Sequence, residues 1–272
     1  MVLMMAAGLA HAARSHVLVP HDGAQIDVIV EGAGDAIVLL PSSQRGSADF
    51  DDVAARIAAA GYKVLRPQPR GIGQSTGSLD GLTLHSLAGD VAATIRALGN
   101  GRAVVVGHAY GHYVARVTDL DYPDLVRGVV MAAAGSAGTI SASALPAALD
   151  IAANVRQPEA ARMAALRLAF FAPGSDPAVW LDDWHPTLAA AYRAAAKVPG
   201  RSDWWPVTHA PVLDLQAAQD PWRPVGTRGE VVDALGGKAS VVVVQHASHA
   251  LFPEQPKAVA EAIVEWVARL PR

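Results

Sequence analysis

The chain has 272 residues, of which 51% are apolar, and it carries a formal net charge of −3 at pH 7. The absence of cysteine excludes disulfide bonds, thiolate catalysis and cysteine-ligated metal sites. Such a small net charge, without any basic run, argues against nucleic acid or an anionic membrane surface as a partner. Length and composition predict a protein with a sizeable core, built as one large or two small domains.

The N-terminal residues 1–10 are largely apolar and lead into Ala10-His11-Ala12, which resembles a signal-peptide cleavage site. The segment is short and has no basic residue before its apolar stretch. Residues 1–15 are therefore predicted to be either an N-terminal arm or the remnant of an export signal, and both a cytoplasmic and an exported protein stay open. Because no other segment approaches the roughly 20 consecutive apolar residues of a membrane span, none is predicted.

Short β-type runs alternate with helical stretches along most of the chain. The predicted strands cover 17–19, 26–31, 36–40, 63–66, 103–106, 128–131, 212–216 and 240–244. Helices, with apolar residues at three- and four-residue spacing, are predicted over 48–60, 84–98, 112–120, 226–235 and 257–270. The first two strands can form a hairpin, and the later Val, Leu and Ile runs are typical of parallel strands buried on both faces. The pattern predicts an α/β protein with a mostly parallel, eight-stranded sheet between helices.

Between residues 136 and 210 this alternation stops. The stretch is rich in alanine, follows a helical pattern and contains Trp180, Trp184, Trp204 and Trp205. It is predicted to be a helical insertion between two strands of the sheet. Trp184, Trp204 and Trp205 are candidates for contact with a partly apolar or aromatic substrate beneath a lid, and the alternative is that they form the core of a small helical layer.

The most informative stretch is Gly107-His108-Ala109-Tyr110-Gly111, which follows an apolar run and precedes a helical segment. A strand, a tight turn flanked by glycines and a helix are the setting of a nucleophile elbow, G-x-S-x-G, whose serine attacks the substrate. Ala109 stands at the position of that serine. Its methyl group has no lone pair and no proton to give up, so the sequence excludes covalent catalysis by serine at this position.

The order of these features resembles the α/β-hydrolase superfamily with a cap domain, over roughly residues 17–271. The features are the loop Pro41-Ser42-Ser43 after a strand, the stretch Gly71-Ile72-Gly73-Gln74-Ser75, the elbow, the helical insertion, Asp220 and His249. The resemblance implies a hydrolase core over 16–135 and 211–272 and a helical cap over 136–210. It also implies that the catalytic acid and histidine follow the nucleophile position along the chain.

A histidine and an aspartate stand where this family places its catalytic pair. His249 lies between the last predicted strand and the last helix, and the pattern His-x-x-x-x-Glu-x-Pro that begins there resembles the family's histidine loop. Asp220 follows the preceding strand, where a carboxylate can accept the second N–H of His249 and fix its tautomer. His246, expected to be structural or exposed, and Asp214, which falls inside a strand, are weaker candidates.

An oxyanion hole needs two backbone N–H groups aimed at the developing negative charge. By the resemblance, one comes from Tyr110, directly after the elbow position, and the other from Ser42 or Ser43. Ser42, Ser43 and Gln44 are also candidates for direct substrate contact, and the alternative for them is an ordinary polar turn. His108, inside the elbow, is a further candidate for the binding site.

Two further residues depart from the family pattern. Gln68 replaces the acid in a stretch that otherwise resembles Asp-x-Arg-Gly-x-Gly-x-Ser, and His112 follows the elbow glycine directly. His112 is expected to pack under the helix rather than face the pocket. No histidine has a partner at metal-ligand spacing such as His-Glu-x-x-His, so no metal and no cofactor are predicted.

The resemblance implies an enzyme that acts on a partly apolar small molecule. Because the chain departs from the family pattern at several positions, a native Ala109 is favoured over an engineered one. His249, paired with Asp220, then acts as a general base, in hydrolysis of an ester or lactone-like bond or, alternatively, in a lyase or cofactor-free oxygenase reaction. The competing hypotheses are a serine hydrolase inactivated by Ser→Ala at 109 and a non-catalytic small-molecule binder. The substrate and the oligomeric state are left open.

Overall fold

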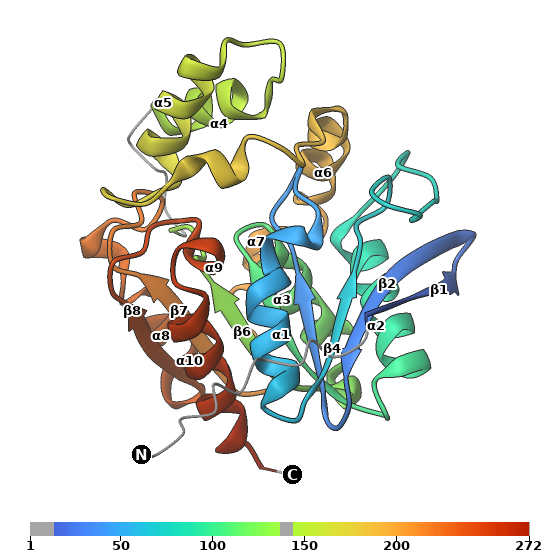
Figure 1. Cartoon of the computed structure of the whole chain (residues 1–272). Coiled ribbons are helices and arrows are strands. Elements are labelled where there is room, and N and C mark those ends of the chain that lie inside the picture. Colours follow the sequence, from blue (N-terminus) through green and yellow to red (C-terminus); the bar gives the residue numbers. More distant parts are fainter. Residues whose placement is uncertain (1–13, 137–143, 272) are drawn as a thin grey trace, which may run out of the picture.

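The computed structural model describes residues 14–136 and 144–271. This part of the chain contains an eight-stranded sheet with the strand order β1-β2-β4-β3-β5-β6-β7-β8 (Figure 1). The strands are β1 (Ser15–His21), β2 (Ala24–Gly32), β3 (Ala36–Leu40), β4 (Lys63–Pro67), β5 (Ala103–His108), β6 (Val126–Ala132), β7 (Val212–Ala217) and β8 (Ala239–Val244). β1 and β2 form the predicted hairpin, β2 is antiparallel to β4, and the other neighbours are parallel. The predicted fold class is confirmed.

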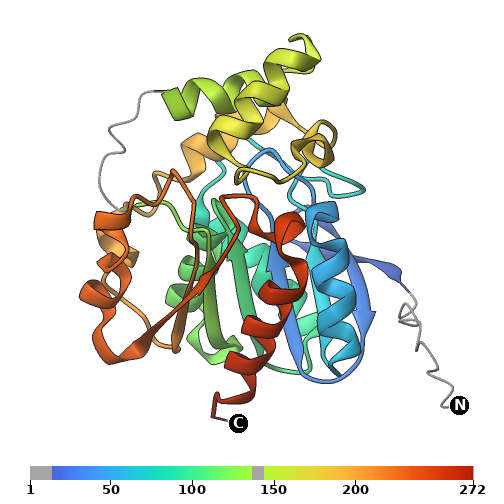
Figure 2. The same cartoon turned by 60° about the vertical axis from the view of Figure 1, so that its left-hand side comes forward.

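Helices cover both faces of the sheet (Figures 1 and 2) because alternate residues of a strand point to opposite sides. The helices outside the insertion are α1 (Asp51–Ala59), α2 (Leu84–Leu98), α3 (Gly111–Asp121), α8 (Glu230–Leu235), α9 (Leu251–Glu254) and α10 (Pro256–Ala268), with short 3-10 turns η1 (Ser47–Phe50), η2 (Pro123–Leu125), η5 (Val225–Thr227) and η6 (Gly236–Lys238). Val104 and Val106 of β5 pack in the cluster that contains α1 and α10 side chains. Ala103 and Val105 pack in the cluster with α2 and α3. The central strands are thus buried on both sides, as their unbroken apolar runs indicate.

Two elements differ from the sequence-based expectation. The helix predicted over 226–235 is α-helical only in α8, because the glycines at 226 and 229 disfavour a helix. β8 is less buried than an inner strand, with Val241 39% and Val242 37% exposed. The reason is its place at the edge of the sheet, where no further strand covers it.

The insertion between β6 and β7 lies above the carboxyl ends of the parallel strands (Figure 1). Its described elements are α4 (Ala144–Ala153), α5 (Glu159–Ala169), α6 (Ala189–Ala195) and α7 (Arg201–Trp204), with the 3-10 turns η3 (Pro177–Trp180) and η4 (Pro186–Leu188). α4 and α5 pack in a hydrophobic cluster that also contains Phe170 and Trp180 of the insertion and Ala250 of the core. The division into core and cap at residues 136 and 210 stays a prediction, and most of the predicted arm 1–15 lies outside the described residues.

One arginine clamps this insertion to the core. The guanidinium of Arg45, in the loop after β3, lies 4.7 Å from the ring centre of Trp180 and 4.8 Å from that of Trp184. It also donates two hydrogen bonds to Asp49 and one to the carbonyl of Asp182. Because Arg45 is 2% exposed, this stacking occurs away from water, where cation–π contacts are strongest.

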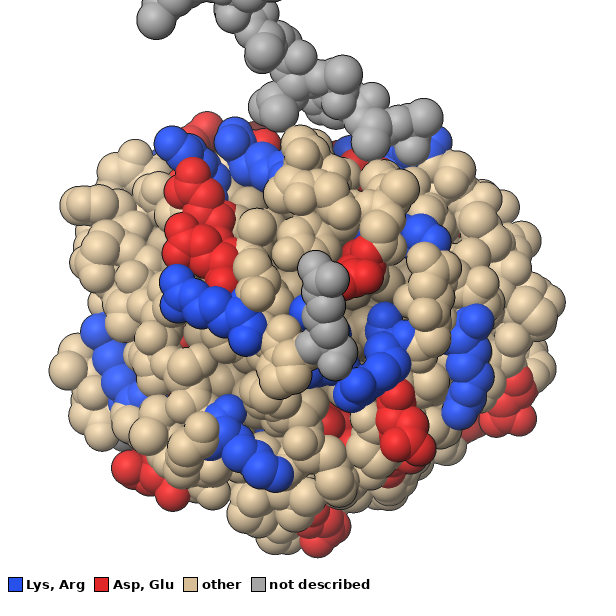
Figure 3. Space-filling view, turned by 90° about the horizontal axis from the view of Figure 1, so that it is seen from below, with Lys and Arg blue, Asp and Glu red and all other residues tan. Residues whose placement is uncertain are grey.

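The surface of the described chain shows no specialisation by charge on the face opposite the insertion. Lys and Arg side chains are interspersed there with Asp and Glu (Figure 3). No helix within residues 14–136 and 144–271 is both long and apolar enough to cross a bilayer.

Candidate active site

The turn between β5 and α3 is sharp, and its geometry explains both glycines of the motif. Ala109 has φ 46°, a left-handed conformation that costs a residue with a Cβ about 1–2 kcal/mol. A Cβ on Gly107 would lie 2.3 Å from the backbone carbon of Gly111, and one on Gly111 would lie 2.4 Å from the carbonyl oxygen of Leu40. The Ala109 N–H donates to the Ala132 carbonyl at 2.9 Å. The strained turn is therefore held between β3 and β6.

His249 and Asp220 meet next to this turn. The Nδ1 atom of His249 lies 3.0 Å from Oδ2 and 3.2 Å from Oδ1 of Asp220, and both side chains are buried. Asp220 also accepts a hydrogen bond at 2.9 Å from the backbone N–H of Trp222, which fixes the carboxylate in its loop. With the Nδ1 proton donated to Asp220, the Nε2 atom of His249 carries the lone pair that a general base requires.

His108 lies behind His249 and supports its loop. Its Nε2 donates to the backbone carbonyl of His249 at 2.8 Å, and the two rings are 5.6 Å apart. Burial, together with the nearby His249, lowers the pKa of His108 from 6.5 to about 3. His108 is therefore a neutral hydrogen-bond donor, and it does not line the cavity described below. Its direct contact with substrate stays a prediction.

His112 packs beneath the elbow, in line with its expected place. Its Nδ1 and backbone N–H both bind the carbonyl oxygen of Ala109, and its ring contacts Tyr113 and Trp204. Burial holds the pKa of His112 well below its ordinary value, and the charges of nearby arginines add to this effect. Because a peptide unit is planar and trans, fixing the Ala109 carbonyl on the side of His112 turns the Tyr110 N–H to the opposite side.

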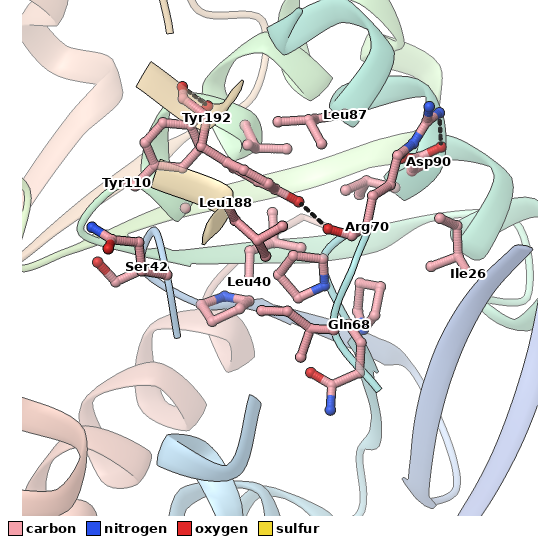
Figure 4. Close-up of a pocket in the computed structure, with 18 residues that line it drawn as sticks. Ile26, Leu40, Ser42, Gln68, Arg70, Leu87, Asp90, Tyr110, Leu188 and Tyr192 are labelled. Carbon is pink, nitrogen blue, oxygen red and sulfur yellow. Dashed lines mark hydrogen bonds and ion pairs between the residues drawn. The ribbon is translucent and has the colours of Figure 1, made fainter. Parts of the chain in front are cut away.

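A small cavity adjoins the elbow (Figure 4). Its volume is about 50 Å³, well below the roughly 150 Å³ of an apolar cavity that binds benzene. Its walls are mostly apolar, formed by Ile26, Leu40, Pro41, Pro67, Pro69, Ile72, Leu87, Val91, Val114 and Leu188. Tyr110, Ser42 and Gln44 also line it, so three of the predicted binding residues lie together, while Ser43 does not line it.

At the polar end of the cavity, a positive and a negative side chain neutralise each other. Arg70 donates two hydrogen bonds of 2.8 Å to Asp90, and His21 lies 2.9 Å from the same carboxylate. The hydroxyl of Tyr192 donates to the carbonyl of Arg70 at 3.2 Å (Figure 4). A paired arginine and aspartate leave little net charge at this end, so the cavity suits an uncharged group.

The three candidate tryptophans lie elsewhere. Trp184 stacks on Arg45, Trp204 packs against His112 and Tyr113, and Trp205 lies 4.3 Å from the guanidinium of Arg201. The cavity's lining includes none of them, and their contact with substrate stays a prediction. Each is placed by packing within or beneath the insertion.

The insertion instead reaches the cavity with Leu188 and Tyr192, which the sequence analysis did not single out. The sequence does contain a pattern that could have indicated them. These two bulky residues stand four apart around a run of alanines, a spacing that would place them on one face of a helix. His246 is exposed and Asp214 is buried inside β7, as the sequence indicates.

The predicted contribution of Tyr110 to the site is made by its backbone N–H. It precedes α3, so its amide N–H has no acceptor within that helix, while its side-chain hydroxyl donates to the Tyr192 carbonyl at 2.9 Å. Tyr110→Phe is expected to lower the free energy of unfolding by about 0.5–1.5 kcal/mol, the value of one hydrogen bond, and to leave turnover unchanged. Urea unfolding and steady-state kinetics measure both. A large fall in turnover at unchanged stability would place the hydroxyl itself in the reaction.

The parallel sheet, the strained turn after β5 and the His–Asp pair at the carboxyl edge define an α/β-hydrolase fold. A family model described as "Alpha/beta hydrolase family" matches residues 37–262, and the chain belongs to that family. The predicted superfamily is thereby confirmed. Hydrolases are found among the proteins that this chain resembles in sequence.

A 2-(acetamidomethylene)succinate hydrolase of Mesorhizobium japonicum is 30% identical over 105 residues, 39% of this chain and 37% of the relative. A 2-hydroxy-6-oxononadienedioate/2-hydroxy-6-oxononatrienedioate hydrolase of Burkholderia vietnamiensis is 33% identical over 138 residues, 47% of this chain and 46% of the relative. The chain thus matches less than half the length of each of these curated relatives.

Solved structures agree over nearly the whole fold. An esterase from Thermogutta terrifontis has a TM-score of 0.74 at 23% identity, covering 95% of this chain and 99% of the esterase. The structure of E-2-(acetamidomethylene)succinate hydrolase has a TM-score of 0.78 at 19% identity, covering 94% of this chain and all of the other. At these identities the likeness establishes the fold alone.

Proposed function

We propose that the protein hydrolyses an ester or lactone-like bond in a small, partly apolar molecule by general-base catalysis, without a covalent intermediate. The observation that carries this proposal is the pairing of His249 with Asp220 beside an elbow whose central residue, Ala109, cannot act as a nucleophile. A protein that only binds its ligand has no need of an oriented imidazole at this place.

The proposed reaction uses groups that the chain provides. The Nε2 atom of His249 takes a proton from a water molecule, whose oxygen attacks the substrate carbonyl carbon. The N–H of Tyr110 and a backbone N–H of the loop at Ser42 stabilise the negative oxygen of the tetrahedral intermediate. When the intermediate collapses, the imidazolium returns its proton to the leaving oxygen. Asp220 stabilises the imidazolium between the two transfers.

The cavity supports a limit on the substrate. Its apolar walls and the paired charges of Arg70 and Asp90 favour an uncharged group. Its volume of about 50 Å³ favours a group of only a few heavy atoms next to the scissile bond. The curated relatives named above act on small molecules according to their names, which also supports a small-molecule substrate here.

A panel of short-chain aryl esters and lactones tests the proposal. The wild-type protein should release product, show no added acyl mass on the intact chain, and resist labelling by a fluorophosphonate. Ala109→Ser is the matched variant, because a serine there can be labelled. An inert wild type beside an active, labelled Ala109→Ser variant would contradict the proposal and support a serine hydrolase that has lost its nucleophile. Ligand binding without product, indifferent to Asp220→Asn, would instead indicate a non-catalytic binder.

A further inference from the structure

The segment 169–172, which we call the strap, begins at the last residue of α5 and joins the insertion to the loops that carry Asp220 and His249. The indole Nε1 of Trp222, in the loop of Asp220, donates to the carbonyl of Ala169 at 2.7 Å. The backbone N–H of Ala250, next to His249, donates to the carbonyl of Phe170 at 2.8 Å. The strap therefore touches the acid loop and the histidine loop at adjacent residues.

The carboxylate of Glu254 makes the third connection. Its Oε1 accepts from the backbone N–H of Ala172, in the strap, at 2.7 Å. Its Oε2 accepts from the backbone N–H of Ser248, the residue before His249, at 2.6 Å. Hydrogen bonds to a charged acceptor are roughly twice as strong as neutral ones. One side chain thus joins the insertion to the loop that carries the proposed base.

Aromatic contacts follow the same path. The ring of His249 lies 5.8 Å from that of Phe170, in the strap, and 5.5 Å from that of Trp222. Phe170 and Trp222 are themselves 6.1 Å apart. Ala250 and Trp222 pack in the hydrophobic cluster of α4 and α5. The imidazole consequently contacts one ring from the insertion and one from the acid loop, and these two rings also contact each other.

We propose that Glu254 is a positioning residue, which holds His249 in register with Asp220 by fixing the histidine loop to the strap. A carboxylate is needed because both its oxygens accept from backbone N–H groups. An amide would turn its own NH₂ donors toward one of these two N–H groups. This inference rests on the proposed function for the role of His249, but its structural content is independent of any substrate.

The tautomer of His249 is the readout. Donation to Asp220 fixes the Nδ1–H form, whereas a neutral imidazole in water prefers the Nε2–H form. Two-bond ¹H–¹⁵N correlation spectra distinguish the two, and a His249→Ala spectrum assigns the signals. We expect the wild type to show the Nδ1–H form and Glu254→Ala to lose it. Asp220→Ala, which removes the acceptor itself, provides the reference spectrum for this loss. Glu261→Ala, at an exposed glutamate on α10, is the matched control and should keep it.

Glu254→Gln keeps the side-chain volume and provides a second test if Glu254→Ala does not fold. It should retain the fold by circular dichroism while its His249 signals move toward the Asp220→Ala pattern. A full Nδ1–H pattern in folded Glu254→Gln or Glu254→Ala would overturn the proposal. A wild type with the Nδ1–H form but without hydrolytic activity would instead overturn the proposed function and leave the role of Glu254 standing.

Discussion

His249→Ala is expected to lower kcat by about 10²- to 10⁴-fold, the usual contribution of a general base. The variant loses the only imidazole that pairs with Asp220 in the described structure, so water must attack without a proton acceptor. Binding should be preserved, because His249 does not line the cavity. Steady-state kinetics on a hydrolysed panel member and calorimetric titration of an apolar product analogue separate the two effects.

The matched control is His246→Ala, which removes an exposed imidazole three residues earlier in the same loop. It should retain wild-type kcat. The kcat of Asp220→Asn should lie between those of His249→Ala and His246→Ala. The amide preserves the shape of the side chain but cannot stabilise an imidazolium by charge. Unchanged turnover in His249→Ala would rule out the general-base mechanism.

Arg223→Met is expected to lower the free energy of unfolding by about 3–5 kcal/mol, the cost of removing one partner of a buried ion pair. Arg223 and Asp214 are 2% and 0% exposed, and Nη2 of the arginine lies 3.0 Å from Oδ2 of the aspartate. The same guanidinium donates to the carbonyls of Ala134 and Thr227. Urea unfolding at pH 7 measures the loss, and Asp214→Leu/Arg223→Met should recover much of it.

The loss should depend on pH with a definite sign. Burial, its largest cause, raises the pKa of Asp214 from 3.8 even though Arg223 opposes the shift. Without Arg223 the pKa rises further. A carboxyl group whose pKa is higher in the folded state than in the unfolded state stabilises the fold at any pH below the unfolded-state pKa. This stabilisation is lost as the pH rises through the folded-state pKa. The deficit of Arg223→Met should therefore shrink as the pH falls toward 4. A deficit independent of pH would contradict the assignment to Asp214.

Much of the fold could be predicted because it depends on local pattern. The unbroken apolar run before the elbow indicates a strand buried on both faces, and β5 is buried throughout. His249 and Asp220 were expected to pair by the family resemblance, and both follow parallel strands, which end at one edge of the sheet. The structure brings His249 and Asp220 together there, while their catalytic roles stay predictions.

The lining of the cavity was not predictable in the same way. Which residues of the insertion face the core depends on how the insertion is docked, and Arg45 contributes to this docking through rings more than 130 positions away in the chain. Aromatic character alone suggested a lid over a substrate. In the structure the tryptophans contact arginines and one another, and Leu188 and Tyr192 line the cavity, while substrate contact by the tryptophans stays a prediction.

The Arg45 clamp has a consequence for exchanging caps between relatives of this fold. Arg45 belongs to the loop after β3, but Trp180 and Trp184 belong to the insertion. In a chimaera that exchanges only the insertion for that of a relative, the buried guanidinium of Arg45 would lose both of its aromatic partners. Trp180 and Trp184, transferred to a relative, would likewise lose their cation. An exchange of caps should therefore transfer the segment from Arg45 to Asp49 together with the insertion, so that the contacts between the two are kept.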